Sequence, residues 1–265
     1  VVVSQLLNQS PGEISVFDAR QQDEHNVPKS YPLTYGQQGL WFLYQLAPES
    51  AAYNLAFTAH ICSNLDVSAL QRAVQKLVDR HPTLRTVFKQ QGGEPFQKVC
   101  QDREVEIKQI DASSWKCDEL RKEAISAHRE PFDLERGSLL RVNLFTRSEQ
   151  DHFLLLGIHH IAIDGFSLGI LVDELRLLYQ SESTGQTVSL PPIEKQYGRF
   201  VQWQKEMLES PIGETHRNYW LQKLSGELPL LKLPVDRWRS QSAKQQGAFY
   251  NFQLDRQLTE QLKAM

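Results

Sequence analysis

Apolar and polar positions alternate between helical and strand spacing from Tyr31 onward. Helical spacing is clearest after Asp66, which can cap a helix whose apolar face consists of Leu70, Val74, Leu77 and Val78. Residues 35–46 predict a helix capped by Thr34, with one apolar face made of Leu40, Leu43 and Leu46. Further helices are predicted at residues 114–128, 167–179, 194–209 and 213–224, and the opening of another at 255–265, capped by Asp255.

Strand spacing predicts the remaining elements. Residues 83–89 and 95–99 flank Gly92-Gly93, a hairpin signal, and residues 139–145 and 151–158 flank a polar turn. Residues 153–158 are continuously apolar, which is typical of a strand buried on both faces. Other strands are predicted at 55–62, 105–110 and 248–254. Strands that alternate with helices in this way predict an α/β fold with a mixed sheet.

The first thirty residues differ from the rest of the chain. Residues 10–30 are rich in Ser, Gln, Asp, Pro and Lys and predict a linker. The apolar run from Val1 to Leu7 fits either the last helix of a preceding domain or a frayed terminus. The chain lacks an initiator Met and its final predicted helix has just begun, so we expect a fragment of a longer protein.

Composition excludes several classes of protein. Of 265 residues, 40% are hydrophobic and 23% charged, with a net charge of −3, so no broad basic surface for nucleic acid or anionic membranes is expected. The most apolar stretch, residues 153–172, contains two histidines and an aspartate, which favours a soluble core over a membrane span. Three widely spaced cysteines indicate a reducing cytoplasm.

Candidate chemistry lies directly after the buried strand, in the run from His159 and His160 to Asp164 and Gly165. Adjacent strand residues point to opposite faces, so one histidine should face a cavity while the other packs inside. An imidazole with a pKa of about 6.5 suits removal of a proton from an acyl acceptor near neutral pH. Asp164 could orient the imidazole or hold the loop, and a backbone N–H near Gly165 could stabilise an oxyanion.

Three other interpretations of the pair are open at this point. Two histidines at a strand end are often a satisfied structural pair. Two histidines and an aspartate are also legitimate zinc ligands, although adjacent strand ligands diverge and no other His/Cys/Asp cluster lies nearby in sequence. A Ser-His-Asp hydrolase is the weakest of these interpretations. We therefore expect no metal.

The loop and three flanking segments resemble the condensation domains of nonribosomal peptide synthetases, in the chloramphenicol-acetyltransferase-like superfamily. HHIAIDG at 159–165 is similar to the family's H-H-x-x-x-D-G signature. TYGQQGLWFL at 34–43 resembles S-x-A-Q-x-R-L-W-x-L, RHPTLRTVF at 80–88 resembles R-H-E-x-L-R-T-x-F, and YGRFVQW at 197–203 resembles Y-x-D-F/Y-A-x-W. Gly39, Pro82 and Arg199 depart from these motifs.

The resemblance implies a two-lobed domain in which two acetyltransferase-like halves enclose a tunnel. Donor and acceptor carrier proteins deliver thioesters on phosphopantetheine arms, and the acceptor amine attacks the donor thioester to form an amide. Residues 31–265 contain motifs of the first half only, which implies a C-terminal half as partner and an inactive isolated fragment. The run at 1–9 resembles the end of a carrier-protein helix. No cofactor is expected on this chain itself.

Roles for single residues also follow from the resemblance. His160 matches the catalytic histidine, as a general base or as a group that positions the amine, and His159 matches the structural one. Asp164 matches an aspartate that an arginine holds, for which Arg85 is the best candidate. Trp203 is expected to pack in its helix. Ester formation, acylation of a free acceptor and a non-catalytic recruitment module are the alternative functions, the last disfavoured by the intact His160 and Asp164.

Overall fold

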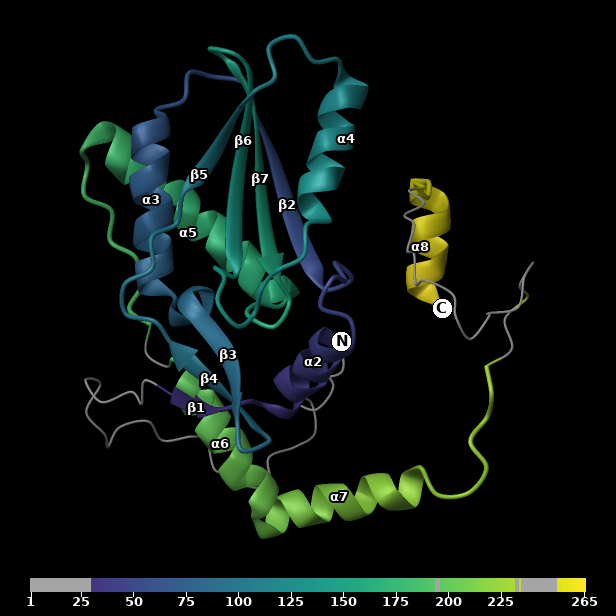
Figure 1. Cartoon of the computed structure of the whole chain (residues 1–265). Helices are drawn as coiled ribbons and strands as arrows, with labels where there is room; N and C mark the ends of the chain where they lie inside the picture. Colours follow the sequence, from purple (N-terminus) through teal and green to yellow (C-terminus); the bar gives the residue numbers. More distant parts are fainter. Residues whose placement is uncertain (1–29, 194–195, 232–233, 235–251) are drawn as a thin grey trace. The chain divides into compact units, whose positions relative to one another are not determined.

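The computed structural model describes residues 30–193, 196–231, 234 and 252–265 (Figure 1). Residues 1–29, which hold the predicted carrier helix and nearly all of the predicted linker, lie outside the described residues, so both assignments stay predictions. The chain forms two compact units, one up to Arg217 and one from Asn218.

The strands are β1 (Ser30–Pro32), β2 (Asn54–Ile61), β3 (Thr86–Gln91), β4 (Glu94–Val99), β5 (Ile107–Asp111), β6 (Leu140–Ser148) and β7 (Asp151–His159). The helices are α2 (Tyr35–Leu46), α3 (Val67–Arg80), α4 (Cys117–His128), α5 (Gly165–Thr184), α6 (Tyr197–Glu209), α7 (Pro211–Lys223) and α8 (Arg256–Ala264), with a 3-10 turn at Pro82–Arg85. The predicted strand at 248–254 is wrong where it is described, because residues 252–254 have no regular structure.

A four-stranded sheet with the order β2-β7-β6-β5 forms the centre of the first unit. β5 and β6 are parallel, whereas β7 is antiparallel to both neighbours, which confirms the predicted α/β class with a mixed sheet. α4 provides the crossover between the parallel strands, as a parallel pair requires. Figure 1 also shows a smaller sheet with the order β1-β4-β3 beside the first.

Both faces of the large sheet are covered by helices. Leu154, Leu156 and Ile158 of β7 are buried in a cluster with α3 and α5, whereas Leu155 packs with Leu120 of α4 in a separate cluster. Alternate residues of one strand therefore serve opposite layers, which is why the β7 sequence is apolar without interruption. The strand that leads to the histidines is thus fixed on both sides.

The α3 helix follows its sequence pattern closely. The Asp66 carboxylate accepts the Ala69 N–H at 2.9 Å, and all four predicted apolar positions are buried. The Gly92-Gly93 hairpin is confirmed as well, since both residues have positive φ (59° and 90°), which glycine adopts without strain.

The α2 helix has the predicted bounds, but of the predicted apolar face only Leu40 packs against a buried cluster. Thr34 caps it in a capping box with Gln37, while Leu43 and Leu46 are 40% and 66% exposed. Trp41 is buried instead, in a cluster whose other buried members are Leu33, Phe88, Phe132, Leu134, Leu139 and Ile161. The buried stripe includes the polar Gln37, so apolar spacing alone selects the wrong side of the helix.

None of the helices within the described ranges is both long and apolar enough for a membrane crossing.

Candidate active site

The histidine loop connects the end of β7 to the start of α5. Backbone hydrogen bonds fix its first residues: the His160 N–H donates to the Tyr53 carbonyl at 2.8 Å, and the Ala162 N–H donates to the His159 carbonyl at 3.0 Å. The loop then ends at Asp164, where α5 begins with Gly165. His160 therefore has a fixed backbone position although it lies just beyond the strand.

His159 faces the protein interior. The residue is only 6% exposed, its Nδ1 accepts the Ile161 N–H at 3.1 Å, and its ring meets the edge of Phe132 at a centroid distance of 6.0 Å. Burial, and secondarily the neighbouring His160, lower the pKa of His159 to about 4. The ring is thus neutral at physiological pH, with Nδ1 committed to the loop backbone.

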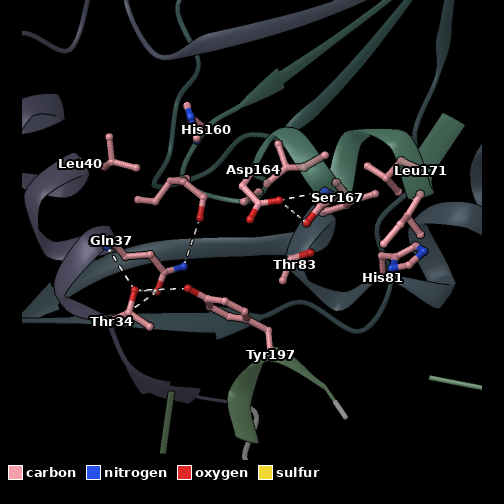
Figure 2. Close-up of a pocket in the computed structure, with 16 residues that line it drawn as sticks. Thr34, Gln37, Leu40, His81, Thr83, His160, Asp164, Ser167, Leu171 and Tyr197 are labelled. Carbon is pink, nitrogen blue, oxygen red and sulfur yellow. Dashed lines mark hydrogen bonds between the residues drawn. The ribbon is translucent and has the colours of Figure 1, made fainter. Parts of the chain in front are cut away.

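His160 is exposed and lines a cavity of about 430 Å³ in the first unit. We call this space the His160 cavity. Its wall is mainly apolar, with polar groups at a few points; the lining residues are Thr34, Gly36, Gln37, Leu40, His81, Thr83, Leu84, His160, Ile161, Ala162, Ile163, Asp164, Ser167, Ile170, Leu171 and Tyr197 (Figure 2). The two adjacent histidines therefore lie in different environments, as strand geometry predicts.

Asp164 acts as the N-cap of α5. Its Oδ1 accepts the Ser167 N–H at 2.8 Å and the Ser167 hydroxyl at 2.7 Å, shown as dashed lines in Figure 2. These bonds are the main cause of a lowered pKa of the Asp164 carboxyl, with smaller contributions from the Phe166 N–H and from His160. The carboxylate therefore ties the end of the histidine loop to the first turn of α5.

The structure does not bring Arg85 and Asp164 together, contrary to the predicted ion pair. The Arg85 guanidinium donates instead to the Cys100 carbonyl at 2.6 Å and the Asp79 carbonyl at 3.4 Å. Arg85 closes the 3-10 turn after α3, next to the end of β4, so nearby backbone carbonyls are its partners. Asp164 in turn satisfies its carboxylate within its own helix turn.

Gly165 occupies the first position of α5 without a steric need for glycine. It is not among the glycines with positive φ, and a Cβ built there would meet no heavy atom within 4 Å. Neither the backbone conformation nor the surrounding space therefore requires a glycine at this position.

A buried amide pair that sequence reasoning missed supports the loop from below. The Gln37 Nε2 donates to the Ile161 carbonyl and to the Gln97 Oε1, both at 3.2 Å, and the Gln97 Nε2 donates to the Gln37 Oε1 at 2.8 Å and to the Pro32 carbonyl at 2.9 Å. Gln37 and Gln97 are only 5% and 1% exposed. Their pair joins α2, β4 and the histidine loop, and the available signal was the match of Gln37 to the Gln of the first motif.

A second missed group joins the end of α3 to α5. Glu174 is 9% exposed and accepts Arg80 Nε at 3.0 Å, Arg80 Nη2 at 3.2 Å and His81 Nε2 at 2.6 Å. Burial alone would raise the pKa of Glu174, but these charged partners outweigh it and lower that pKa. The Arg-His pair that opens the second motif thus fixes the helix that follows the histidine loop.

The first and fourth motifs meet at the floor of the His160 cavity. The Tyr197 hydroxyl lies 3.2 Å from the Thr34 hydroxyl, and burial raises the pKa of Tyr197 (Figure 2). Trp203 of the fourth motif is half-buried beside Phe200, at a ring-centroid distance of 5.7 Å. Within the described part of the chain, no group of three or more His, Cys, Asp or Glu side chains is arranged to hold a metal ion.

Comparison with known proteins identifies related sequences and structures. A family model described as a condensation domain matches residues 27–265. The chain is 38% identical over 235 residues to chondramide synthase cmdD of Chondromyces crocatus, covering 87% of this chain and 6% of that protein. It is 35% identical over 260 residues to phosphinothricin tripeptide synthetase PhsC of Streptomyces viridochromogenes, covering 96% of this chain and 23% of that protein.

Solved structures show the same fold. The first condensation domain of the calcium-dependent antibiotic synthetase, in complex with substrate analogue 3a, has a TM-score of 0.67 and 26% identity; the match covers 77% of this chain and 51% of that one. The starter condensation domain of rhizomide synthetase RzmA has a TM-score of 0.68 at 19% identity, over 74% of this chain and 48% of that one. The chain thus spans about half of a solved condensation domain and a small part of the curated synthetases. The chain belongs to the condensation-domain family of nonribosomal peptide synthetases.

Proposed function

We propose that this chain supplies the histidine half of an acyl-transfer site that forms an amide bond between two carrier-bound thioesters. The observation that carries the proposal is the position of His160, exposed in the His160 cavity while the adjacent His159 is buried and committed to the backbone. One imidazole is thereby available to a substrate, at the end of a strand packed on both faces.

The reaction balances without a cofactor on this chain. The acceptor amine attacks the donor thioester carbonyl, a C–N bond forms, the C–S bond breaks, and the carrier thiolate leaves with the proton that the amine loses. His160 accepts or guides that proton, or holds the amine in line with the carbonyl. The thioesters arrive on the phosphopantetheine arms of a donor and an acceptor carrier protein.

Asp164 is assigned to holding the loop. Its carboxylate caps α5 through Ser167, so its lone pairs serve the helix terminus. The Asp164 carboxylate and an oxyanion bound at the Gly165 N–H would compete for the positive end of the same helix, which disfavours an oxyanion site at Gly165. We keep the Gly165 N–H as a secondary proposal.

The setting of the site is also proposed from the family. Residues 31–265 would form the N-terminal half of a condensation domain whose C-terminal half closes the tunnel, with residues 10–30 as a linker and 1–9 as the end of a carrier domain. A cytoplasmic location is supported by Cys62, Cys100 and Cys117, which are all free thiols.

The test is His160→Ala in the synthetase that contains this chain, assayed with loaded donor and acceptor carriers. We expect condensation to fall by about a hundredfold or more, the range for loss of a general base. His60→Ala is the matched control, since His60 is also exposed but lies at the opposite end of β2 from Asn54, the residue paired with His159. Condensation by His160→Ala at the rate of the control would overturn the proposal.

The acceptor distinguishes amide formation from the related reactions. Amide product should form from an aminoacyl carrier, with little turnover when a hydroxyacyl carrier or a free amine replaces it. The isolated chain, mixed with the same loaded carriers, should give no product above the uncatalysed background, because the partner half is required. Product mass spectrometry reads both results.

A further inference from the structure

Gly36 stands out among the residues that line the His160 cavity because it contributes no side chain to the wall. It is exposed, its φ is not positive, and a Cβ built on it would meet no heavy atom within 4 Å. The backbone therefore accepts any L-residue at this position, and a larger side chain would extend into open space.

The helix gives no reason for a glycine at this position. Gly36 lies in the first turn of α2, between the Thr34 cap and Gln37, and glycine is one of the poorest helix formers. The neighbouring wall is apolar, with Leu40 one turn further along α2 and Ile161 and Ile163 on the histidine loop. The absent side chain thus enlarges an apolar space that His160 also lines.

We infer that Gly36 is a specificity-determining residue, which leaves room beside His160 for a bulky apolar side chain of a carrier-bound thioester. This inference rests on the proposed function, since it assigns a substrate class to the same cavity. Either the donor or the acceptor acyl group can carry that side chain, and the two sources are separated by varying one partner at a time.

Gly39 provides a matched control on the same helix. It is exposed, has no positive φ, and its Cβ would also meet no heavy atom within 4 Å, but it lies outside the lining of the His160 cavity. Gly36→Leu and Gly39→Leu add the same side chain and remove the same helix-disfavouring residue. They differ in whether the substituted residue lines the His160 cavity.

The experiment compares wild type, Gly36→Leu and Gly39→Leu in the complete synthetase. Rates are measured with alanyl and phenylalanyl carriers as acceptor against a fixed small donor, and then as donor against a fixed glycyl acceptor. In one of the two series, Gly36→Leu should lower the phenylalanyl-to-alanyl rate ratio by about tenfold to a hundredfold, whereas Gly39→Leu leaves it at the wild-type value. Thermal unfolding should show both variants folded.

The outcomes separate this inference from the proposed function. If wild type condenses no pair of carrier substrates, the proposed function fails. If wild type condenses them and Gly36→Leu changes neither ratio relative to Gly39→Leu, the assignment of Gly36 is overturned while the proposed function stands. A Gly36→Ala variant with an intermediate ratio would support a graded effect of side-chain volume.

Discussion

The adjacent histidines differ above all in their access to water. His159 is enclosed by Phe132 and by the loop backbone, so protonation would place a charge in a buried site. His160, one residue further, is exposed to the cavity. His159 should therefore contribute to the pH dependence of folding.

The first prediction concerns that pH dependence. Between pH about 6.5 and about 4 the unfolded chain binds a proton that folded His159 does not, so the free energy of unfolding should fall as pH decreases through this window. The contribution is on the order of 3 kcal/mol at full protonation of the unfolded state. Urea unfolding at several pH values measures it.

His159→Gln should flatten this part of the pH profile, because an amide has no proton to gain. The difference in unfolding free energy between wild type and His159→Gln is the quantity to follow, since carboxyl groups titrate in both proteins. A difference that stays constant over the window would contradict the low pKa.

The second prediction concerns Asp164. Because Asp164 is an N-cap and not one half of a buried ion pair, Asp164→Ala should lower the free energy of unfolding by about 1–2 kcal/mol. A broken buried ion pair would lower it by about 3–5 kcal/mol. Asp66→Ala, which removes the equivalent cap of α3, is the control. Both variants should be destabilised to a similar extent, but only Asp164→Ala should also lose condensation activity.

At the scale of elements, two amide pairs join α2 to the small sheet in different environments. Gln37 and Gln97 are buried beneath the histidine loop, whereas Gln45 donates to Gln90 at 2.9 Å on the exposed side. A buried amide without a partner is costly, while an exposed one exchanges its partner for water. The two pairs should therefore differ in their contribution to stability.

The third prediction follows from this contrast. Gln97→Leu should lower the free energy of unfolding by about 1–3 kcal/mol, because Gln37 Oε1 and the Pro32 carbonyl lose a buried donor. Gln90→Leu should change it by less than about 0.5 kcal/mol. If both variants lost the same free energy of unfolding in a denaturant titration, burial would not determine how much each amide pair contributes.

The sequence predicted whole elements better than it predicted contacts between them. α3 was predictable because its apolar residues follow helical spacing, and β7 because residues 153–158 are continuously apolar; α2 had clear bounds because Thr34 and Gln37 form a capping box. The buried face of α2 was not predictable, since Gln37 is buried only when Gln97 and the Ile161 carbonyl are present. Such partners come from distant segments.

The candidate site shows the same division. His160 was placed correctly at a strand end because that position depends on local sequence. The partner of Asp164 was not predicted correctly, because a carboxylate can accept hydrogen bonds within its own turn or pair with a distant cation. Residue types alone do not decide between these two partners. Glu174 had no local signal at all, since only the packing of α3 on α5 brings Arg80 to it.

At the scale of the molecule, the hydrophobic clusters seen among the described residues lie in the first unit. The three hydrophobic clusters draw their buried residues from positions 33–175, whereas Tyr219, Trp220 and Leu221 just beyond the unit boundary are each more than half exposed. The clusters that position the histidine loop are thus made of residues of the first unit.

The fourth prediction tests this division. A chain that ends after Arg217 should keep a cooperative unfolding transition, with a midpoint within a few degrees of the longer chain. A chain that ends after Gln196 should be less stable, because it loses Tyr197 at Thr34 and the buried Val201. Circular dichroism during heating compares them, and loss of the transition in the first truncation would contradict the assignment of the core.

The pairing of β2 with β7 also has a consequence for synthesis on the ribosome. Asn54 lies opposite His159, roughly a hundred residues later in the chain. At a synthesis rate of about 5–20 residues per second, about 5–20 s pass between the synthesis of β2 and that of its partner strand β7. The β2–β7 pair that leads to the histidine loop is thus assembled late, and the β2 backbone stays unpaired with β7 during that interval.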